Sequence, residues 1–231
     1  MSKKLTAFLL LFTLALTGCG ESTQSNNISS TNNNSQYKTE DIQITNADDA
    51  LARLKAGNER FVNNKSELIN VTSERRDELL DHQSPYAIVV SCSDSRVTPT
   101  TVFNAGLGEI FDIRIAGNVV DDDGLGSIEY AVEHLNTPLI VVMGHEKCGA
   151  VTAAYDKLKN NTPVEGKLNS LVDKMIPNIT DADSLNDAIN ENADAFADVI
   201  ENNEIVKKFV DEGKVKIVKA YYSLDGKVTF D

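Results

Sequence analysis

Three short apolar runs constrain what this chain can fold into more than any other feature of its sequence. They are Tyr86–Val90, Ile110–Ile115 and Leu139–Met143, and each is bounded by proline, glycine or a polar turn. Runs of this length and composition predict β-strands that are buried on both faces. Between the second and third runs, apolar residues recur at helical spacing over Ser127–Leu135. A strand, a helix and a second strand in this order predict a right-handed parallel crossover unit.

Further periodic segments surround these strands. Four of them have helical periodicity: one from Asn46 onward, capped by Thr45 or Asn46, then Ser73–Asp81, Gly149–Leu158, and Leu185–Val210 as one long or two shorter helices. Near the C-terminus, Val215–Tyr222 and Lys227–Phe230 flank an Asp-Gly pair that is typical of a hairpin. The sequence therefore predicts an α/β fold: a mostly parallel four- to five-stranded sheet flanked by helices, with an antiparallel edge strand from the C-terminal hairpin and an N-terminal helical arm.

The charge of the chain limits its partners. Of its 231 residues, 22 are Lys or Arg and 35 are Asp or Glu, which leaves a formal net charge of −13. Phosphate contacts need clustered Lys and Arg, and no run of basic residues is longer than two. We therefore expect no nucleic-acid partner. With 41% hydrophobic and 25% charged residues, the composition is that of a folded globule of one domain or two.

The first 18 residues resemble an export signal. Two lysines precede the apolar run Leu5–Leu16, which at about twelve residues is shorter than the roughly twenty that a membrane-spanning helix needs. The sequence Leu16-Thr17-Gly18-Cys19 resembles the bacterial lipobox, in which the cysteine is lipidated and becomes the new N-terminus. The alternative is an ordinary secretory signal that happens to contain a cysteine. We favour a lipoprotein signal peptide over residues 1–18 and a lipid on Cys19.

The segment after Cys19 differs in composition from the rest of the chain. Residues 19–45 are dominated by Ser, Thr, Asn and Gln, which predicts a flexible linker. The folded domain is expected over residues 46–231. Together these segments predict an exported lipoprotein that is anchored to the membrane through Cys19, on the outer side of the cytoplasmic membrane or in the periplasm of a bacterium.

Two cysteines remain within the predicted domain, Cys92 and Cys148. In an exported protein, the default for such a pair is a disulfide. However, Cys92 follows directly after one predicted parallel strand, and His145 and Cys148 follow another. Sites in open α/β sheets form at the edge where the parallel strands end. Two cysteines and one histidine are also the ligand set of a tetrahedral zinc with an open fourth position, so we favour zinc over the disulfide.

These residues resemble a known family. The motif Cys92-x-Asp94-x-Arg96, with His145-x-x-Cys148 after a later strand, is similar to the beta class of carbonic anhydrase. The resemblance covers about four fifths of the chain, from about residue 46 onward. It also includes the motif Arg114-x-Ala116-Gly117-Asn118. It implies one Zn²⁺ per subunit, bound by Cys92, His145 and Cys148 with water as the fourth ligand, and the reversible hydration of carbon dioxide to bicarbonate and a proton by zinc-bound hydroxide.

The residue types of the first motif suit this chemistry. Zinc lowers the pKa of its bound water towards roughly 7 to 9, an effect known from the three-histidine class of carbonic anhydrase. Two thiolates donate more charge than imidazoles do, so they leave the metal a weaker Lewis acid, and nearby groups must compensate. Arg96 is placed to hold the Asp94 carboxylate ionised, so that Asp94 can accept the hydroxide proton and orient the oxygen towards carbon dioxide. The alternative for this pair is a salt bridge that only stabilises a turn.

A plant-type subclass of the family lines its carbon dioxide pocket with a glutamine, a phenylalanine and a tyrosine, and the corresponding positions here hold Gln83, Phe111 and Tyr130. The resemblance implies that Gln83 donates a hydrogen bond to a substrate oxygen. The two rings would form the apolar wall that a small uncharged gas prefers. Taken singly, Gln83 can also be a surface loop residue and the aromatic residues part of the core. Glu146 departs from the family pattern, which often has Thr or Ser after the ligand histidine.

The resemblance also implies a homodimer or a higher even-numbered homo-oligomer, because the family builds its site at a dimer interface. Two alternative functions stay open. One is hydrolysis of carbon disulfide or carbonyl sulfide, which similar family members perform. The other is a non-catalytic bicarbonate-binding module, in which Asp94 closes the zinc site or Cys92 and Cys148 form a disulfide.

Overall fold

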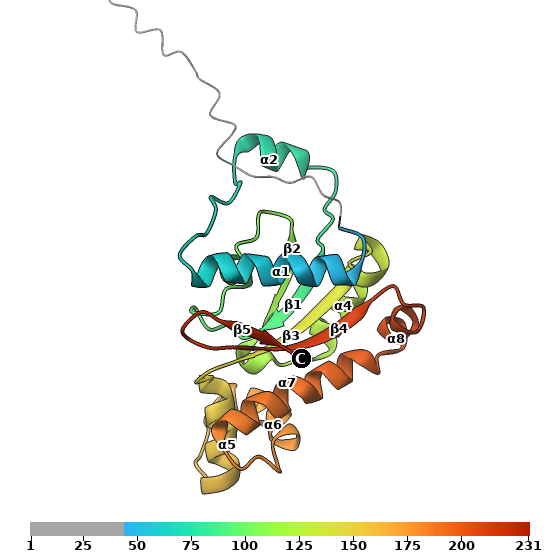
Figure 1. Cartoon of the computed structure of the whole chain (residues 1–231). Helices are drawn as coiled ribbons and strands as arrows, with labels where there is room; N and C mark the ends of the chain where they lie inside the picture. The colour runs from blue at the N-terminus through green and yellow to red at the C-terminus, as the bar shows by residue number, and fades with distance from the viewer. Residues whose placement is uncertain (1–43) are drawn as a thin grey trace, which may run out of the picture. The chain divides into compact units, whose positions relative to one another are not determined.

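Five strands form a single sheet in residues 44–231, which are the residues that the computed structural model describes (Figure 1). The strands are β1 (Ala87–Ser91), β2 (Ile110–Arg114), β3 (Leu139–His145), β4 (Lys216–Tyr222) and β5 (Val228–Phe230). Their order is β2-β1-β3-β4-β5, and only β5 is antiparallel to its neighbour. The predicted α/β fold is thus confirmed. The predicted signal peptide, Cys19 and nearly all of the predicted linker lie outside the described residues.

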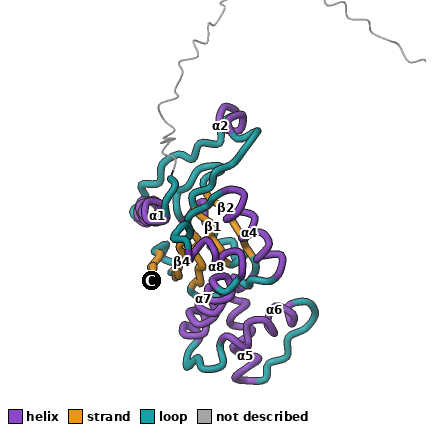
Figure 2. The backbone as a smooth tube through the Cα atoms, turned by 90° about the vertical axis from the view of Figure 1, so that its right-hand side faces the viewer, coloured by secondary structure: helices purple, strands orange, loops and turns teal. Residues whose placement is uncertain are grey.

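Alternate side chains of the strands face two hydrophobic clusters. From β1, Ile88 and Val90 belong to one cluster and Ala87 and Val89 to the other. The first cluster is covered by α4 (Asp122–Leu135), α5 (Gly149–Asn160), α6 (Leu168–Met175), α7 (Leu185–Glu201) and α8 (Glu204–Asp211), and the second by α1 (Ala47–Val62) and α3 (Pro99–Val102). Figure 2 shows α1 on one side of the strands and α4, α7 and α8 on the other. Because both faces of the sheet are covered, the central strands β1 and β3 are buried along their whole length and almost entirely apolar.

Polar caps explain where two helical segments begin. The Asn46 side chain accepts a 2.9 Å hydrogen bond from the N–H of Asp49, so Asn46 is the cap that starts α1. The predicted helix Leu185–Val210 consists of two helices, α7 and α8. The Asn203 side chain lies between them and accepts hydrogen bonds from the N–H groups of Ile205 and Val206, both at 3.1 Å. A new cap inside a periodic stretch therefore ends one helix and starts the next.

Other helix boundaries differ from the prediction. α4 begins at Asp122 rather than Ser127, because Asp121 caps it and two glycines conceal the periodicity of its first turns. Helix α2 (Ser73–Glu78) ends three residues before Asp81 and has no buried residue, so no packed face extends it. Helices α3 and α6 were not predicted. Within residues 44–231, no helix combines the length and the apolar character needed to cross a membrane.

The carboxyl ends of the parallel strands position the candidate site. Cys92 follows directly after β1. β3 continues to His145, two residues beyond the predicted end at Met143, so His145 is the last residue of the strand rather than part of the turn that follows it. After β2 the chain turns through Ala116–Asn118, where Gly117 has a left-handed φ of 71°. The ends of three neighbouring strands thus lie along one edge of the sheet.

Candidate metal centre

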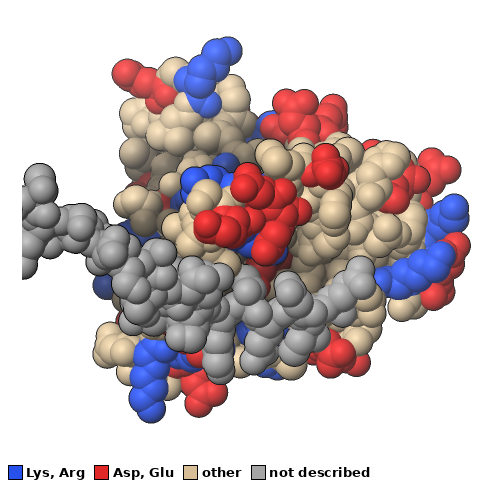
Figure 3. Space-filling model, turned by 90° about the horizontal axis from the view of Figure 1, so that it is seen from above, with Lys and Arg blue, Asp and Glu red and all other residues tan. Residues whose placement is uncertain are grey.

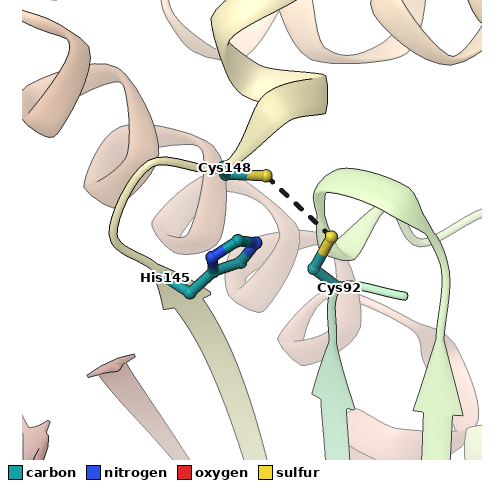
Figure 4. A group of neighbouring side chains, drawn as sticks. All are labelled: Cys92, His145 and Cys148. Carbon is teal, nitrogen blue, oxygen red and sulfur yellow. Dashed lines mark hydrogen bonds between the residues drawn. The ribbon is translucent and has the colours of Figure 1, made fainter. Parts of the chain in front are cut away.

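Three buried side chains meet at this edge of the sheet: Cys92 after β1, His145 at the end of β3, and Cys148 directly before α5. Their potential ligand atoms all lie within 4.8 Å of one another. Figure 4 shows the three side chains pointing towards a common point from three separate elements. The structure therefore brings together the three residues that the sequence predicts as metal ligands.

The two cysteines are not joined by a disulfide bond and are linked by a hydrogen bond. The Cys148 thiol donates to Cys92 Sγ over 4.0 Å, about twice the length of a disulfide bond. The backbone N–H of Gly117 donates to the same sulfur at 3.3 Å. The bond from Cys148 lowers the pKa of Cys92 to about 4 and raises the pKa of Cys148 well above its usual range. The hydrogen bonds to Cys92 Sγ favour its thiolate form, which is the form of cysteine that binds a metal ion.

His145 is held in the tautomer that suits a metal ligand. Its Nδ1 lies 2.9 Å from the carbonyl oxygen of Glu146. A carbonyl oxygen only accepts hydrogen bonds, so Nδ1 carries the proton and Nε2 keeps its lone pair. Nε2 is buried and has no hydrogen-bond partner. An unpartnered buried nitrogen beside two cysteine sulfurs fits a zinc ion, which prefers sulfur and nitrogen ligands in tetrahedral geometry.

Asp94 is fixed beside these ligands by two arginines. Arg96 Nε donates to Oδ1 at 2.9 Å and Arg96 Nη2 to Oδ2 at 2.7 Å, while the Arg96 backbone N–H also donates to Oδ1 at 2.9 Å. These bonds hold the pKa of the Asp94 carboxyl well below its usual range. Arg114, at the end of β2, donates to the backbone carbonyls of Asp94 at 2.7 Å and Cys92 at 3.2 Å. The loop after β1 is therefore held in place by hydrogen bonds to the Asp94 side chain and to the backbone carbonyls of Cys92 and Asp94.

Sequence reasoning assigned no role to two residues that contribute here. Gly117 lies in the Arg114–Asn118 motif, and its left-handed φ, together with the contact that an added Cβ would make with Met175 Sδ, leaves no room for a side chain. Asn192 on α7 is fully buried and donates to the Gly117 carbonyl oxygen at 2.9 Å. A sequence signal existed for Asn192, because it occupies a core position on the apolar face of its helix.

The predicted substrate residues lie away from the metal ligands within one chain. Phe111 on β2 and Tyr130 on α4 contact each other, with ring centroids 6.4 Å apart, and Tyr130 is 46% exposed. Gln83 is exposed and precedes β1. Strand β1 separates it from Cys92, which at about 3.3 Å per residue is a distance of roughly 16 Å. The structure thus brings Phe111 and Tyr130 together and leaves Gln83 at the far end of the strand.

Glu146 faces the C-terminal hairpin. Its carboxylate accepts hydrogen bonds from the N–H of Leu224 at 2.9 Å and from Ser223 Oγ at 3.3 Å, and Lys147 lies 3.3 Å away. The bond from Leu224 is the largest cause that lowers the pKa of Glu146. The backbone N–H of Glu146 donates to the carbonyl oxygen of Tyr222 at 2.8 Å. Glu146 therefore ties the turn after His145 to the β4–β5 connection.

The sequence matches a family model described as carbonic anhydrase over residues 87–228. Among curated relatives, Carbonic anhydrase 2 of Mycobacterium tuberculosis (strain CDC 1551 / Oshkosh) is 43% identical over 135 residues, which is 58% of this chain and 65% of that protein. The carbonic anhydrase of Mycolicibacterium smegmatis is 44% identical over 130 residues, or 56% of this chain and 63% of that protein. The match thus spans slightly less than two thirds of the length of these relatives.

Solved structures have a similar fold. One of two tetrameric beta-carbonic anhydrases from Sordaria macrospora aligns with a TM-score of 0.63 and 22% identity, covering 79% of this chain and 96% of that chain. The Coccomyxa beta-carbonic anhydrase in complex with acetazolamide aligns with a TM-score of 0.61 and 25% identity, covering 78% of this chain and 85% of that chain.

Proposed function

Because this chain belongs to the beta-carbonic anhydrase family, we propose that it catalyses the reversible hydration of carbon dioxide to bicarbonate and a proton, with one zinc ion held by Cys92, His145 and Cys148. The observation that carries the proposal is the convergence of these three buried side chains around an unpartnered His145 Nε2. The neighbouring Asp94 carboxylate, which is held ionised, supplies the second element that the reaction requires.

In this mechanism the bound zinc supplies a nucleophile near neutral pH by lowering the pKa of a coordinated water. The protein's own groups orient that nucleophile. Asp94, gripped at both oxygens by Arg96, accepts a hydrogen bond from the attacking water and aims its lone pair at the carbon of carbon dioxide. The N–H of Gly117 donates to Cys92 Sγ and withdraws charge from the sulfur, which offsets part of the loss of metal acidity that two thiolates cause.

The two-pronged Arg96–Asp94 pair also supports this function over a closed, non-catalytic zinc site. A carboxylate that already accepts three hydrogen bonds from Arg96 must give up several of them before it can turn onto the metal. Carbon dioxide is uncharged, so the Asp and Glu side chains that Figure 3 shows on the surface do not repel it.

We propose that the active molecule is a homodimer or a higher even-numbered homo-oligomer. Within one chain, Gln83 lies too far from Cys92 to contact a substrate there, and a second copy can supply it. The segment before β1 supports this arrangement: α2 has no buried residue, and Leu68, Val71 and Leu80 are 60%, 57% and 77% exposed. Burying these side chains against a second copy would remove them from water. Gln83, Phe111 and Tyr130 would then form the wall of the carbon dioxide pocket.

The proposal keeps the export signal over residues 1–18, the lipid on Cys19 and the linker over residues 19–45, which place the enzyme at the outer side of a bacterial membrane. Mass spectrometry of the N-terminal peptide of protein expressed in bacteria tests this part. A diacylglyceryl-cysteine at position 19 is the expected result, and an unmodified Cys19 in a cleaved or uncleaved chain contradicts it.

The experiment that tests the activity is stopped-flow measurement of carbon dioxide hydration by the zinc-loaded protein, with metal content measured on the same sample. We expect about one zinc per chain and a hydration rate far above that of the buffer at neutral pH. Carbon disulfide and carbonyl sulfide are assayed in parallel. Zinc without carbon dioxide hydration, or faster turnover of one of the sulfur compounds, contradicts the proposal.

A further inference from the structure

A chain of three hydrogen bonds runs from Asn178, at the end of the 3-10 helix Ile176–Asn178, through Asn192 on α7 into the candidate metal centre. Asn178 Nδ2 donates to Asn192 Oδ1 at 3.2 Å, and Asn192 Nδ2 donates to the carbonyl oxygen of Gly117 at 2.9 Å. The N–H of Gly117 then donates to Cys92 Sγ at 3.3 Å. Asn192 is 75 residues from Gly117 in sequence and has no exposed surface.

The Gly117 turn depends on this support. Gly117 has φ 71° and ψ 24°, and Met175 and Ala150 occupy the space that a side chain at this position would need. Asn192 fixes the carbonyl on one side of the turn, while the N–H on the other side points at the Cys92 sulfur. If the Asn192 amide is removed, the buried Gly117 carbonyl loses its hydrogen-bond partner. A rotation of the turn that gives this carbonyl a new partner would also move the N–H of Gly117 relative to Cys92 Sγ.

A hydrogen bond to a metal-binding thiolate affects the metal in two ways. It fixes where the sulfur lies before the metal binds, which favours binding, and it draws charge from the sulfur, which makes the thiolate a weaker donor. A residue that positions this N–H therefore acts on the metal without touching it.

From these contacts we infer that Asn192 is a positioning residue of the metal centre, acting through Gly117 on the Cys92 sulfur. The inference deepens the proposed function and rests on the metal site assigned there. Asn178 is the outer support of the same chain, because its side chain holds Asn192 Oδ1 and so leaves the Asn192 amide to face Gly117.

The test compares Asn192→Ala with Asn58→Ala. Asn58 on α1 is also buried, at 5% exposure, and bonds to the carbonyls of Val102 and Gly226 and to the N–H of Val228, on the opposite face of the sheet. Both variants leave buried backbone groups without a hydrogen-bond partner, but only Asn192 belongs to the hydrogen-bond chain that reaches Cys92. Two readouts are taken without carbon dioxide: zinc affinity by competition with a chromophoric chelator, and the thiolate-to-cobalt charge-transfer band of the Co²⁺-loaded protein.

We expect Asn192→Ala to lower zinc affinity by up to about tenfold, at the lower end of the effect of removing a direct partner of a metal ligand, because Asn192 acts on Cys92 only through Gly117. We expect its charge-transfer band to move to longer wavelength, because a sulfur without its hydrogen bond gives up charge more easily. Asn58→Ala should lower the melting temperature and leave both readouts unchanged. Equal shifts in the two variants, or no shift in Asn192→Ala, overturn the inference.

If Asn192→Ala does not fold, Asn178→Ala decides the question in the same two readouts. Its side chain is only partly buried, and we expect a smaller change in the same direction. Unchanged zinc affinity and an unchanged band in that variant overturn the inference. Since neither readout requires turnover, a wild-type protein that binds zinc but does not hydrate carbon dioxide contradicts the proposed function and leaves this result intact.

Discussion

The two ends of strand β1 differ in how completely a single chain surrounds them. At the carboxyl end, Cys92 and Asp94 receive hydrogen bonds from Gly117 and Arg114 of the same chain. At the amino end, Gln83 is exposed and follows a helix that has no buried residue. The candidate metal ligands are therefore complete within one chain, whereas the proposed substrate pocket is one that a second copy would complete. The two ends can therefore be tested separately.

The largest expected effect is that of Cys148→Ser, which removes one candidate metal ligand at the carboxyl end of β1. Replacing the thiolate with a hydroxyl leaves two ligands, so we expect much less than one zinc per chain and a loss of activity on the order of 10³-fold or more, since water keeps its high pKa without the metal. Elemental analysis and the hydration assay measure both. Val151→Ala, a buried position in the first turn of α5 directly after Cys148, is the control that should keep its zinc. Full zinc content in Cys148→Ser would contradict the ligand assignment.

Asp94→Asn separates metal binding from catalysis at the same end of the strand. We expect full zinc content and a hydration rate that is lower by about 10²- to 10⁴-fold, because an amide cannot accept the proton that the carboxylate handles. Arg96→Lys is an intermediate variant, because it keeps the positive charge but loses the bidentate contact with Asp94. Its hydration rate should lie between those of wild type and Asp94→Asn. A rate within threefold of wild type for Asp94→Asn would leave Asp94 with only a turn-stabilising role.

Gln83→Ala tests the amino end. We expect normal zinc content and a roughly tenfold lower kcat/KM, the usual effect of one lost hydrogen bond to a substrate. Mixing this variant with Cys148→Ser, after dissociation and reassociation of the subunits, gives mixed dimers. If Gln83 acts across the interface, each mixed dimer contains one complete site and activity rises above that of either variant. Activity equal to the mean of the separate variants would show that Gln83 does not act in trans.

Asp112 on β2 lies beside Val89, in the middle of β1. Its substitution should have the smallest effect of the four, a change in how stability depends on pH. Although its side chain reaches solvent, surrounding protein atoms desolvate the carboxyl and raise its pKa to about 6, against the opposing effect of Arg114. An acid with a raised pKa in the fold favours the folded state when protonated. Its contribution therefore falls as the pH rises from about 4, the pKa in the unfolded chain, to about 6, and stays low above that.

Asp112→Asn should remove this dependence. The melting temperature of the variant minus that of wild type is expected to increase between pH 4.5 and 6.5 and then to level off. Differential scanning fluorimetry on matched zinc-loaded samples measures this difference, and subtraction at each pH removes effects that both proteins share. A difference that does not change with pH would mean that the Asp112 carboxyl has an ordinary pKa in the fold.

The amino-acid sequence alone determined the sheet and the position of the candidate metal ligands. Apolar runs of strand length require burial on both faces, and parallel strands end at one edge, so residues directly after two such runs must lie near each other. For this reason the sequence predicts that Cys92 and His145 lie together, with Cys148 three residues after His145. The periodicity over Leu185–Val210 fits either one helix or two, because an apolar spacing that continues across Asn203 does not show that its side chain caps a new helix.

Only the tertiary structure decided which groups support those ligands. The contact between Asn192 and Gly117 depends on how α7 packs across the sheet, and the contact between Glu146 and Leu224 depends on where the C-terminal hairpin folds back. Such contacts join residues that are 75 and 78 positions apart. Local periodicity carries no information about them, because it specifies which face of an element is buried and not which neighbour it meets there.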